Sequence, residues 1–421
     1  MVDAGIAGSI STLSRMERGK QPLRDVDVIR SLAEALGVHP NVLGLADTRK
    51  RSGLTRVPDA MVGPGQASAE GIDPMRRRTL ITGVAGMAGV ATMGTPAVPG
   101  PTKSDPVATL VRFLLHPPET MGKPVGLDHL RQQIAAAYSL LQHGRYADLA
   151  AYLPHLMSDG LATRAHQPTC QTLAEANGRL ATIHTLASEL MIKLGHDHLA
   201  WTTADRAVQT AQLSDDVLSR ASARRAWAIV LRRAGHADTA QRLVIDTAAA
   251  LQPELHTSAE HLSVYGALLT TAAYTAAVDG NRGDARTLIM EAADAATRLG
   301  ADANHRHTFF GPTNVAIYQI GIARVLGDSG TAIEVARHIN PNAIPAPERR
   351  ARYWTDVARS FHQWNKPEQC YRALLAAEHA TPDEVRYRKP VQHLTTYLLH
   401  HPRARNLPGL RGFAVRTGTA V

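Results

Sequence analysis

The chain has 421 residues and a formal net charge of +9, and 44% of its residues are hydrophobic. At roughly 150 residues per domain, this length predicts two or three domains or one long repeat array. The composition is that of a globular protein and excludes a mostly disordered chain. Aromatic residues make up only 5%, while alanine recurs throughout 135–380. That balance suits close-packed helices better than a sheet, so we expect an all-α protein.

The positive charge is concentrated at the two ends of the chain. Residues 1–56 carry nine lysines and arginines against six acidic residues, and residues 381–421 carry seven against two, whereas 106–380 is balanced at 26 against 25. A basic front is where nucleic acid would bind, and a balanced middle fits a scaffold or a binder of small or peptidic ligands. The two cysteines are too few for a disulfide framework, so we expect a cytoplasmic protein.

Residues 1–47 show short amphipathic helical patterns. Ser9 is a good helix N-cap, Ile10, Leu13 and Met16 share one face, and Gly19 ends the helix. The hydroxyl side chains and the arginine on the opposite face are suited to base edges and phosphates in a major groove. The pattern therefore predicts a DNA-contacting helix near the front of the chain.

The run STLSRMERGKQP, followed about twelve residues later by LAEALGV, resembles the recognition helix and the next helix of the lambda-repressor-like (XRE) helix-turn-helix family. Two helices precede the recognition helix in that family, but only residues 1–7 precede it here. We therefore expect either a start upstream of Met1 or a truncated, partial helix-turn-helix. The resemblance and the exposed face together assign DNA binding to Ile10, Ser11, Thr12, Ser14, Arg15, Arg18 and Lys20.

Residues 48–105 are rich in Gly, Pro and Arg and are predicted to be a linker. Within it, three arginines at 76–78 precede an apolar segment over 79–94, a pattern similar to a twin-arginine export signal. The run is shorter than the roughly 20 apolar residues of a membrane span, so we expect no stable membrane insertion. Its internal position favours a linker element docked on the first repeat. The alternative is an exported binding protein started at Met75.

From 106 onward a helical pattern recurs with a turn residue every 38 to 51 positions. The residue five positions after each turn is small in most cases, as close packing of two antiparallel helices requires. This spacing predicts a tetratricopeptide-like solenoid of six helical hairpins over 106–405, with a terminal helix over 382–401 and a loose basic tail over 406–421. The turn residues are Gly144, Gly195, Gly235, Gly280, Gly327 and Asn365.

The segments FFGPTNVAIYQIGIARVLGDSGTAIEVARHINP and PAPERRARYWTDVARSFHQWNKPEQCYRALLAAEHATPDEVRY resemble the tetratricopeptide-type sensory regions that follow XRE domains in regulators of high-GC Gram-positive bacteria. The order of the two regions is the same here.

The concave face of such a solenoid is a natural site for a peptide or small molecule. Polar and aromatic side chains would line it, although packing between helices is the favoured explanation for any single one of them. The candidates for this groove are Asn177, Arg224, Tyr265, Tyr274, Asn314, Tyr318, Tyr353, Trp354 and Phe361.

Motifs for catalysis, metal binding or cofactor binding are absent from the sequence. The tightest histidine clusters, at 196–198 and 305–307, fall in predicted turns without the H-E-x-x-H spacing of a zinc site. They are therefore interpreted as exposed turn histidines. The chain has no Walker phosphate loop, no Gly-x-Ser-x-Gly and no dinucleotide fingerprint. We expect a non-enzymatic protein with no cofactor.

The favoured hypothesis is a cytoplasmic transcriptional regulator with a DNA-binding front, a linker, and a helical-repeat region that binds a peptide or small-molecule signal and supports a homodimer. A second hypothesis is a protein-interaction scaffold that does not bind DNA.

Overall fold

The computed structural model describes residues 105–116 and 122–419. Its regular elements in these ranges are all helices, with no strand and one isolated bridge between Ala303 and Phe310. The all-α expectation is therefore confirmed. The predicted DNA-binding residues in 1–47 and the apolar segment 79–94 lie outside the described residues.

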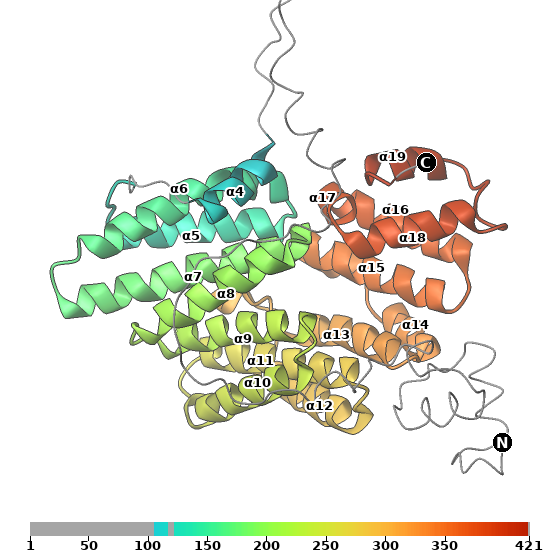
Figure 1. Cartoon of the computed structure of the whole chain (residues 1–421). Coiled ribbons are helices and arrows are strands. Elements are labelled where there is room, and N and C mark those ends of the chain that lie inside the picture. The colour runs from blue at the N-terminus through green and yellow to red at the C-terminus, as the bar shows by residue number, and fades with distance from the viewer. Residues whose placement is uncertain (1–104, 117–121, 420–421) are drawn as a thin grey trace, which may run out of the picture. The chain divides into compact units, whose positions relative to one another are not determined.

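In the described part of the chain, six helical hairpins follow the helix α4 (Pro106–Leu115) (Figure 1). In each hairpin the two helices pack closely against each other. The hairpins pair α5 (Leu127–Gln142) with α6 (Tyr146–Ala165), α7 (Cys170–Leu194) with α8 (Asp197–Gln212), α9 (Val217–Arg233) with α10 (Ala237–Leu251), α11 (Ala259–Val278) with α12 (Arg282–Leu299), α13 (Pro312–Val325) with α14 (Ser329–Arg337), and α15 (Pro347–Gln363) with α16 (Pro367–Ala380).

The six predicted turn residues are the residues that join the helices of each hairpin. All of them adopt positive φ, between 55° at Asn365 and 91° at Gly235. Glycine reaches this left-handed region without steric cost, and asparagine tolerates it better than most residues. The prediction of helical hairpins joined at these turns is confirmed.

The second helix of each hairpin presents a small or apolar residue to the core. The residues five positions after the turns are all buried, with 0 or 1% of their surface exposed. Close approach of two helices needs such residues at the crossing point. They are Leu149, Ala200, Ala240, Ala285, Ala332 and Cys370.

The carboxy-terminal end differs from the prediction. The expected helix over 382–401 is two helices, α17 (Pro382–Arg386) and α18 (Lys389–His400), because Pro390 has no backbone N–H to donate to the carbonyl of Arg386 and stands in the first turn of a new helix. The tail over 406–421, expected to be loose, contains α19 (Leu410–Arg416). Its Leu410 and Phe413 are fully buried, so this prediction was wrong.

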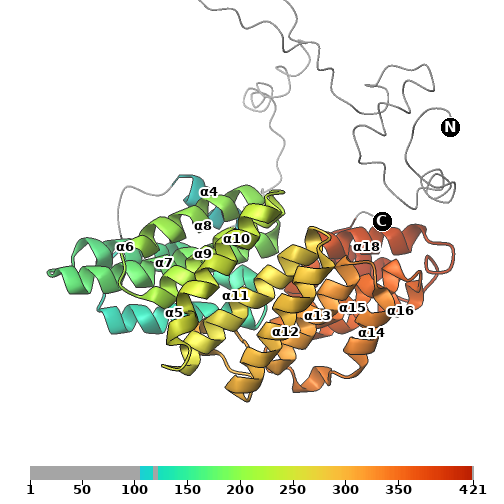
Figure 2. The same cartoon turned by 90° about the horizontal axis from the view of Figure 1, so that it is seen from below.

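The row of hairpins curls back until its first turn meets α17. The carboxylate of Asp383 accepts a hydrogen bond from the backbone N–H of Tyr146 at 2.9 Å, and the Tyr146 hydroxyl donates to the buried Glu384. Thr381 donates to the carbonyl of Gly144 at 3.3 Å. Figures 1 and 2 show α5 and α6 on one side of the row and α15, α16 and α18 on the other. The hairpins therefore form one superhelical turn whose ends touch, called the ring below.

Within the described ranges, no helix combines the length and the apolar character that crossing a membrane would require.

Candidate ligand-binding groove

The interior of the ring is lined by the first helices of the hairpins. Two cavities open there, and apart from interhelical loop residues their walls come from α5, α7, α9, α11, α13, α15 and α18. None of the second helices α6 to α16 contributes a wall residue to either cavity. This division follows from the hairpin geometry, because the small residues of the second helices face the core and leave the first helices to face inward.

The loop over 300–311, called the partition loop below, lies between the two cavities. His307 stacks on the ring of Tyr138 from α5, with centroids 3.9 Å apart, and lines both cavities. Gln142 exchanges two hydrogen bonds of 3.1 Å with Asn304. These contacts connect the fourth interhairpin loop to the first hairpin across the interior of the ring.

The partition loop has an unusual backbone. Arg306, His307 and Phe309 all have positive φ, which costs a non-glycine residue free energy. The side chain of Phe310 anchors the loop, because it is fully buried where Gly266 leaves no Cβ to collide with its ring. Contacts on both sides of the loop therefore hold a conformation that its residues would otherwise avoid.

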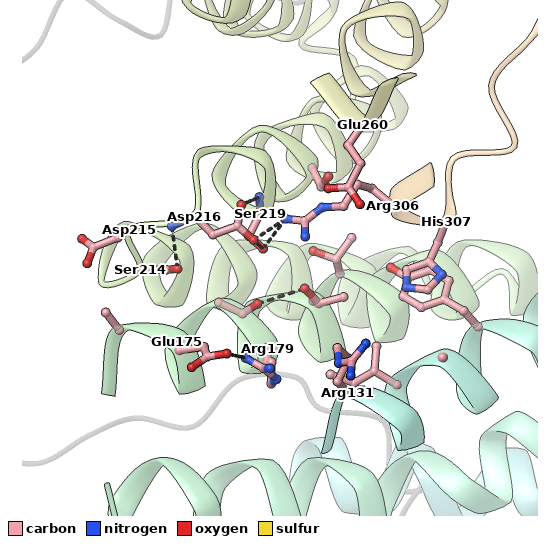
Figure 3. Close-up of a pocket in the computed structure, with 18 of the residues that line it drawn as sticks. Arg131, Glu175, Arg179, Ser214, Asp215, Asp216, Ser219, Glu260, Arg306 and His307 are labelled. Atoms are coloured by element: carbon pink, nitrogen blue, oxygen red, sulfur yellow. Dashed lines mark hydrogen bonds and ion pairs between the residues drawn. The ribbon is translucent and has the colours of Figure 1, made fainter. Parts of the chain in front are cut away.

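The first cavity, called the amino-terminal pocket, has a volume of about 710 Å³ and lies between α5, α7, α9 and the partition loop. Figure 3 shows Arg306 reaching from the loop toward Asp216 and Ser219 at the start of α9. Arg179 pairs with Glu175 at 2.7 Å on the opposite wall. Three arginines and four carboxylates line this pocket, so its charges nearly cancel.

The second cavity, called the basic pocket, has a volume of about 380 Å³ and lies on the other side of the partition loop. Its walls carry three carboxylates, from Glu189, Glu348 and Asp356, against eight cationic side chains. The cationic residues are Lys193, Arg225, Arg232, Arg233, Arg349, Arg352, Arg359 and Arg388.

Five of the eight cations lie within 3.6 Å of a carboxylate. Lys193 contacts both Glu348 and Glu384, and Arg349 lies 3.3 Å from Glu348. The other three pairs, at 2.7 to 3.6 Å, are Arg225 with Glu189, Arg233 with Asp197, and Arg388 with Glu384. Most of the positive charge along this wall is therefore compensated locally.

The other three cations, Arg232, Arg352 and Arg359, are called the arginine cluster below. Arg352 and Arg359 both lie near Asp356, at 3.8 and 3.7 Å, and share that carboxylate with Arg324 at 3.8 Å. Arg232 has no acidic partner in the part of the chain that the structure describes. One carboxylate therefore stands against several guanidinium groups.

Two tyrosines form the apolar side of the arginine cluster. The guanidinium of Arg232 lies 4.8 Å from the centre of the Tyr274 ring, and that of Arg352 lies 4.5 Å from the centre of the Tyr318 ring. Such cation–π contacts stabilise a cation but do not neutralise it.

The uncompensated charge affects the pKa of several groups. Burial alone would raise the pKa of the Tyr318 phenol, but Arg352, Arg225 and Arg349 outweigh it and lower the pKa to about 6. Burial lowers the pKa of the Arg232 and Arg359 guanidiniums, and neighbouring arginines lower both further. The pKa of Arg352 is instead raised, because Tyr318, Asp356 and Glu348 outweigh the effect of burial. Formation of the Tyr318 phenolate reduces the net positive charge, so the pocket favours added negative charge.

Only two of the nine predicted groove residues, Tyr274 and Tyr318, line the basic pocket, and none lines the amino-terminal pocket. Asn177 is buried and donates to the carbonyl of Leu213, and Tyr353 donates from the core to the carbonyl of Ala336. Tyr265 donates its hydroxyl to Glu291 of α12.

The other predicted residues are also explained by packing. Trp354 and Phe361 pack against the core around α15, Asn314 is buried near the start of α13, and Arg224 is half-buried outside both pockets. The structure therefore does not bring the nine residues together as one surface.

The arginines of the basic pocket were missed by the sequence analysis. Arg225 and Arg232 on α9, and Arg352 and Arg359 on α15, are each seven residues apart. That spacing places both members of a pair on one helix face, so inward-facing arginines on two first helices were a usable signal. The interpretation of residues 305–307 as exposed turn histidines was wrong, because His305 and His307 are both half-buried, and His307 lies between the pockets.

Among residues 105–116 and 122–419, no group of three or more His, Cys, Asp or Glu residues is arranged to hold a metal ion. Comparisons with protein-family models, curated proteins and solved structures gave no match to this chain.

Proposed function

We propose that this chain is a DNA-binding transcriptional regulator whose ring binds a signal molecule in its interior groove. The observation that carries the sensory part is the pair of cavities inside the ring, separated by a loop of the same chain. Their volumes of about 710 and 380 Å³ lie within the range typical of small-molecule sites. The role is one of binding and not of catalysis.

The DNA-binding part of the proposal rests on the resemblance of 8–43 to an XRE reader. Its base-reading residues would come from 10–20, with Arg15 the side chain best suited to a guanine edge. Two such readers in a homodimer would contact half-sites about 34 to 36 Å apart. The proposed regulator acts in the cytoplasm, where its operator is accessible.

The proposed switch is a change in the ring. A ligand shifts a conformational equilibrium only if it binds the two states differently. The partition loop supplies a contact that can differ between states, because its strained backbone is held by contacts to the walls of both pockets. Displacement of the loop would join the two cavities and alter the distance between hairpins.

The experiment is selection of binding sites from random duplex DNA by the full chain, followed by a salt titration on selected and scrambled duplexes. Arg15→Ala should weaken binding by about 1 to 3 kcal/mol if Arg15 reads a base. The matched control is Arg337→Ala, which removes the same charge from an exposed position on α14. Absence of binding at every salt concentration would reject the regulator and favour the protein-interaction scaffold.

A truncated reader would give a different result in the same titration. Contacts would then be mostly electrostatic, so binding would show little sequence preference and would fall steeply between about 50 and 200 mM salt. Light scattering of the same sample measures whether the chain is a dimer.

A further inference from the structure

The arginine cluster has more charge than its surroundings compensate. Arg232, Arg352 and Arg359 come from α9 and α15 and line one cavity of about 380 Å³. Asp356 is the carboxylate within 4 Å of Arg352 and Arg359, and Arg324 approaches it as well. Burying a charge without a partner costs free energy, so a fold that keeps such a cluster needs a reason outside its own stability.

The neighbouring charged groups do not remove the excess. Even with Tyr318 ionised, Asp356 and Tyr318 supply two negative charges against the four guanidinium groups of Arg232, Arg324, Arg352 and Arg359. From α7, Glu189 and Lys193 face Arg225 and Glu348, and from the α17–α18 end Glu384 is fully buried and held by Lys193 and Arg388. These carboxylates are therefore occupied by other cations. The Nε atoms of Arg324 and Arg349 are buried and have no hydrogen-bond partner within the described residues.

We propose that the basic pocket binds a phosphorylated small molecule, with its phosphate groups held by Arg232, Arg352 and Arg359. The inference rests on the proposed sensory role of the groove and names the class of signal. Both α15 guanidiniums lie within 3.8 Å of the same carboxylate, so they are close enough to contact one compact anion together.

The chemistry favours phosphate over a single carboxylate. A phosphate monoester carries nearly two negative charges and three acceptor oxygens, and a diphosphate carries more in a group of similar width. Guanidinium groups donate two parallel hydrogen bonds to such oxygens. The rings of Tyr274, Tyr318 and Phe309 line the same cavity and would contact the organic part of the ligand.

The test uses the full chain and sodium pyrophosphate as the probe, in isothermal titration calorimetry at constant ionic strength without added metal. We expect saturable binding of one pyrophosphate per chain. Citrate is the charge-matched carboxylate probe, and it should bind at least 10-fold more weakly. Equal or tighter binding of citrate, or no saturable binding of pyrophosphate at millimolar concentration, would overturn the assignment.

The decisive variant is Arg232→Met, which keeps the length of the side chain and its contact with Tyr274 but removes the charge. It should weaken pyrophosphate binding at least 10-fold and, without ligand, raise Tm by about 2 °C because a buried uncompensated charge is gone. The control, Arg131→Met in the amino-terminal pocket, should leave binding unchanged, since Arg131 is exposed and pairs with Asp128. Unchanged binding in Arg232→Met would place the anion elsewhere on this basic chain and reject the inference.

Two further outcomes separate this inference from neighbouring hypotheses. An acidic peptide that binds the basic pocket while pyrophosphate does not would overturn it in favour of a peptide signal. Bound pyrophosphate should also raise the pKa of Tyr318, seen as loss of tyrosinate absorbance at neutral pH. Pyrophosphate binding by a chain that binds no DNA would leave the inference standing and reject the regulator alone.

Discussion

The two pockets share a wall and a scaffold, yet their charges are arranged differently. In the amino-terminal pocket each of the three arginines has a carboxylate partner: Arg131 with Asp128, Arg179 with Glu175, and Arg306 with Asp216. In the basic pocket, Arg232 has no acidic partner within the described residues, and Arg352 and Arg359 share Asp356 with Arg324 at 3.7 to 3.8 Å. Apart from Arg306 on the partition loop and Arg388 between α17 and α18, the cations of both pockets stand on the first helices of hairpins.

The difference shows that the repeat fixes where a side chain points, while its identity is free to vary. Core positions of the second helices are small because close packing requires it. Groove positions of the first helices have no such requirement, so charge can accumulate there at the expense of stability. The predictions below compare matched residues in the two pockets.

The largest expected effect is the difference in pKa between two tyrosines, one in each pocket. Burial raises the pKa of Tyr138, which lines the amino-terminal pocket, well above its usual value, with Glu189 adding to the effect. The pKa of Tyr318, in the basic pocket, is instead lowered to about 6 by the neighbouring arginines. A spectrophotometric titration of the folded chain should therefore show one tyrosinate forming near pH 6. Tyr318→Phe should abolish this step, and Tyr138→Phe should leave it.

The same pKa shift predicts how stability changes with pH. The pKa of Tyr318 is lower in the folded chain than in the unfolded chain. Its contribution to the free energy of unfolding is therefore complete above about pH 10 and is lost as the pH falls through about 6. A wild-type titration with no tyrosinate below pH 9 would contradict the excess positive charge in the basic pocket.

The second effect comes from removing one acid from each pocket. Lys193 and Arg349 overcome the effect of burial and hold the pKa of Glu348 below its usual value, so this carboxylate is charged in the folded chain. Glu348→Ala would leave the positive charges of Lys193 and Arg349 with less negative charge beside them. It should lower the free energy of unfolding by about 3 to 5 kcal/mol. Glu175→Ala, which removes a half-exposed partner of Arg179, should cost under about 1 kcal/mol.

Urea unfolding at neutral pH measures both variants. Equal losses in the free energy of unfolding would show that the two pockets compensate their positive charges to the same extent, contrary to the comparison above.

The hairpins were predictable because their signals are local. A left-handed turn needs glycine or asparagine, and a close helix crossing needs a small residue five positions later, so Gly235 and Ala240 identify one hairpin without reference to the rest of the chain. The α19 signal was also present, since Leu410, Phe413 and Ala414 share one face, but the segment was interpreted from its basic charge as a loose tail.

The site was less predictable because it depends on contacts between distant segments. Gln142 and Asn304 are 162 positions apart, and no local pattern indicates that their loop crosses the ring. Aromatic residues were chosen as groove candidates, but Tyr353 is as well suited to the core as Tyr318 is to the pocket. The arginine pairs at 225 and 232 and at 352 and 359 would have identified the inward face.

The smallest expected effect concerns the partition loop, which borders both pockets. Burial, with a contribution from Arg306, lowers the pKa of His307 to about 4, and burial lowers that of His184 in α7 to about 4 as well. Both groups bind protons more readily when the chain is unfolded, so stability should fall as the pH drops from about 6.5 toward 4. Because His307 is half-buried, its share should be about 1 to 2 kcal/mol. In urea unfolding at pH 7 and pH 5, His307→Gln should therefore lose less stability on acidification than the wild type, while His184→Gln serves as the comparison outside the loop.

Amide hydrogen exchange over 300–311 locates the effect. In the wild type the exchange should rise at pH 5 beyond the intrinsic change with pH, because a protonated His307 beside Arg306 no longer favours the stack on Tyr138. Identical pH dependence in the wild type and His307→Gln would mean that His307 is already solvated at pH 7 and that the loop does not separate the two pockets.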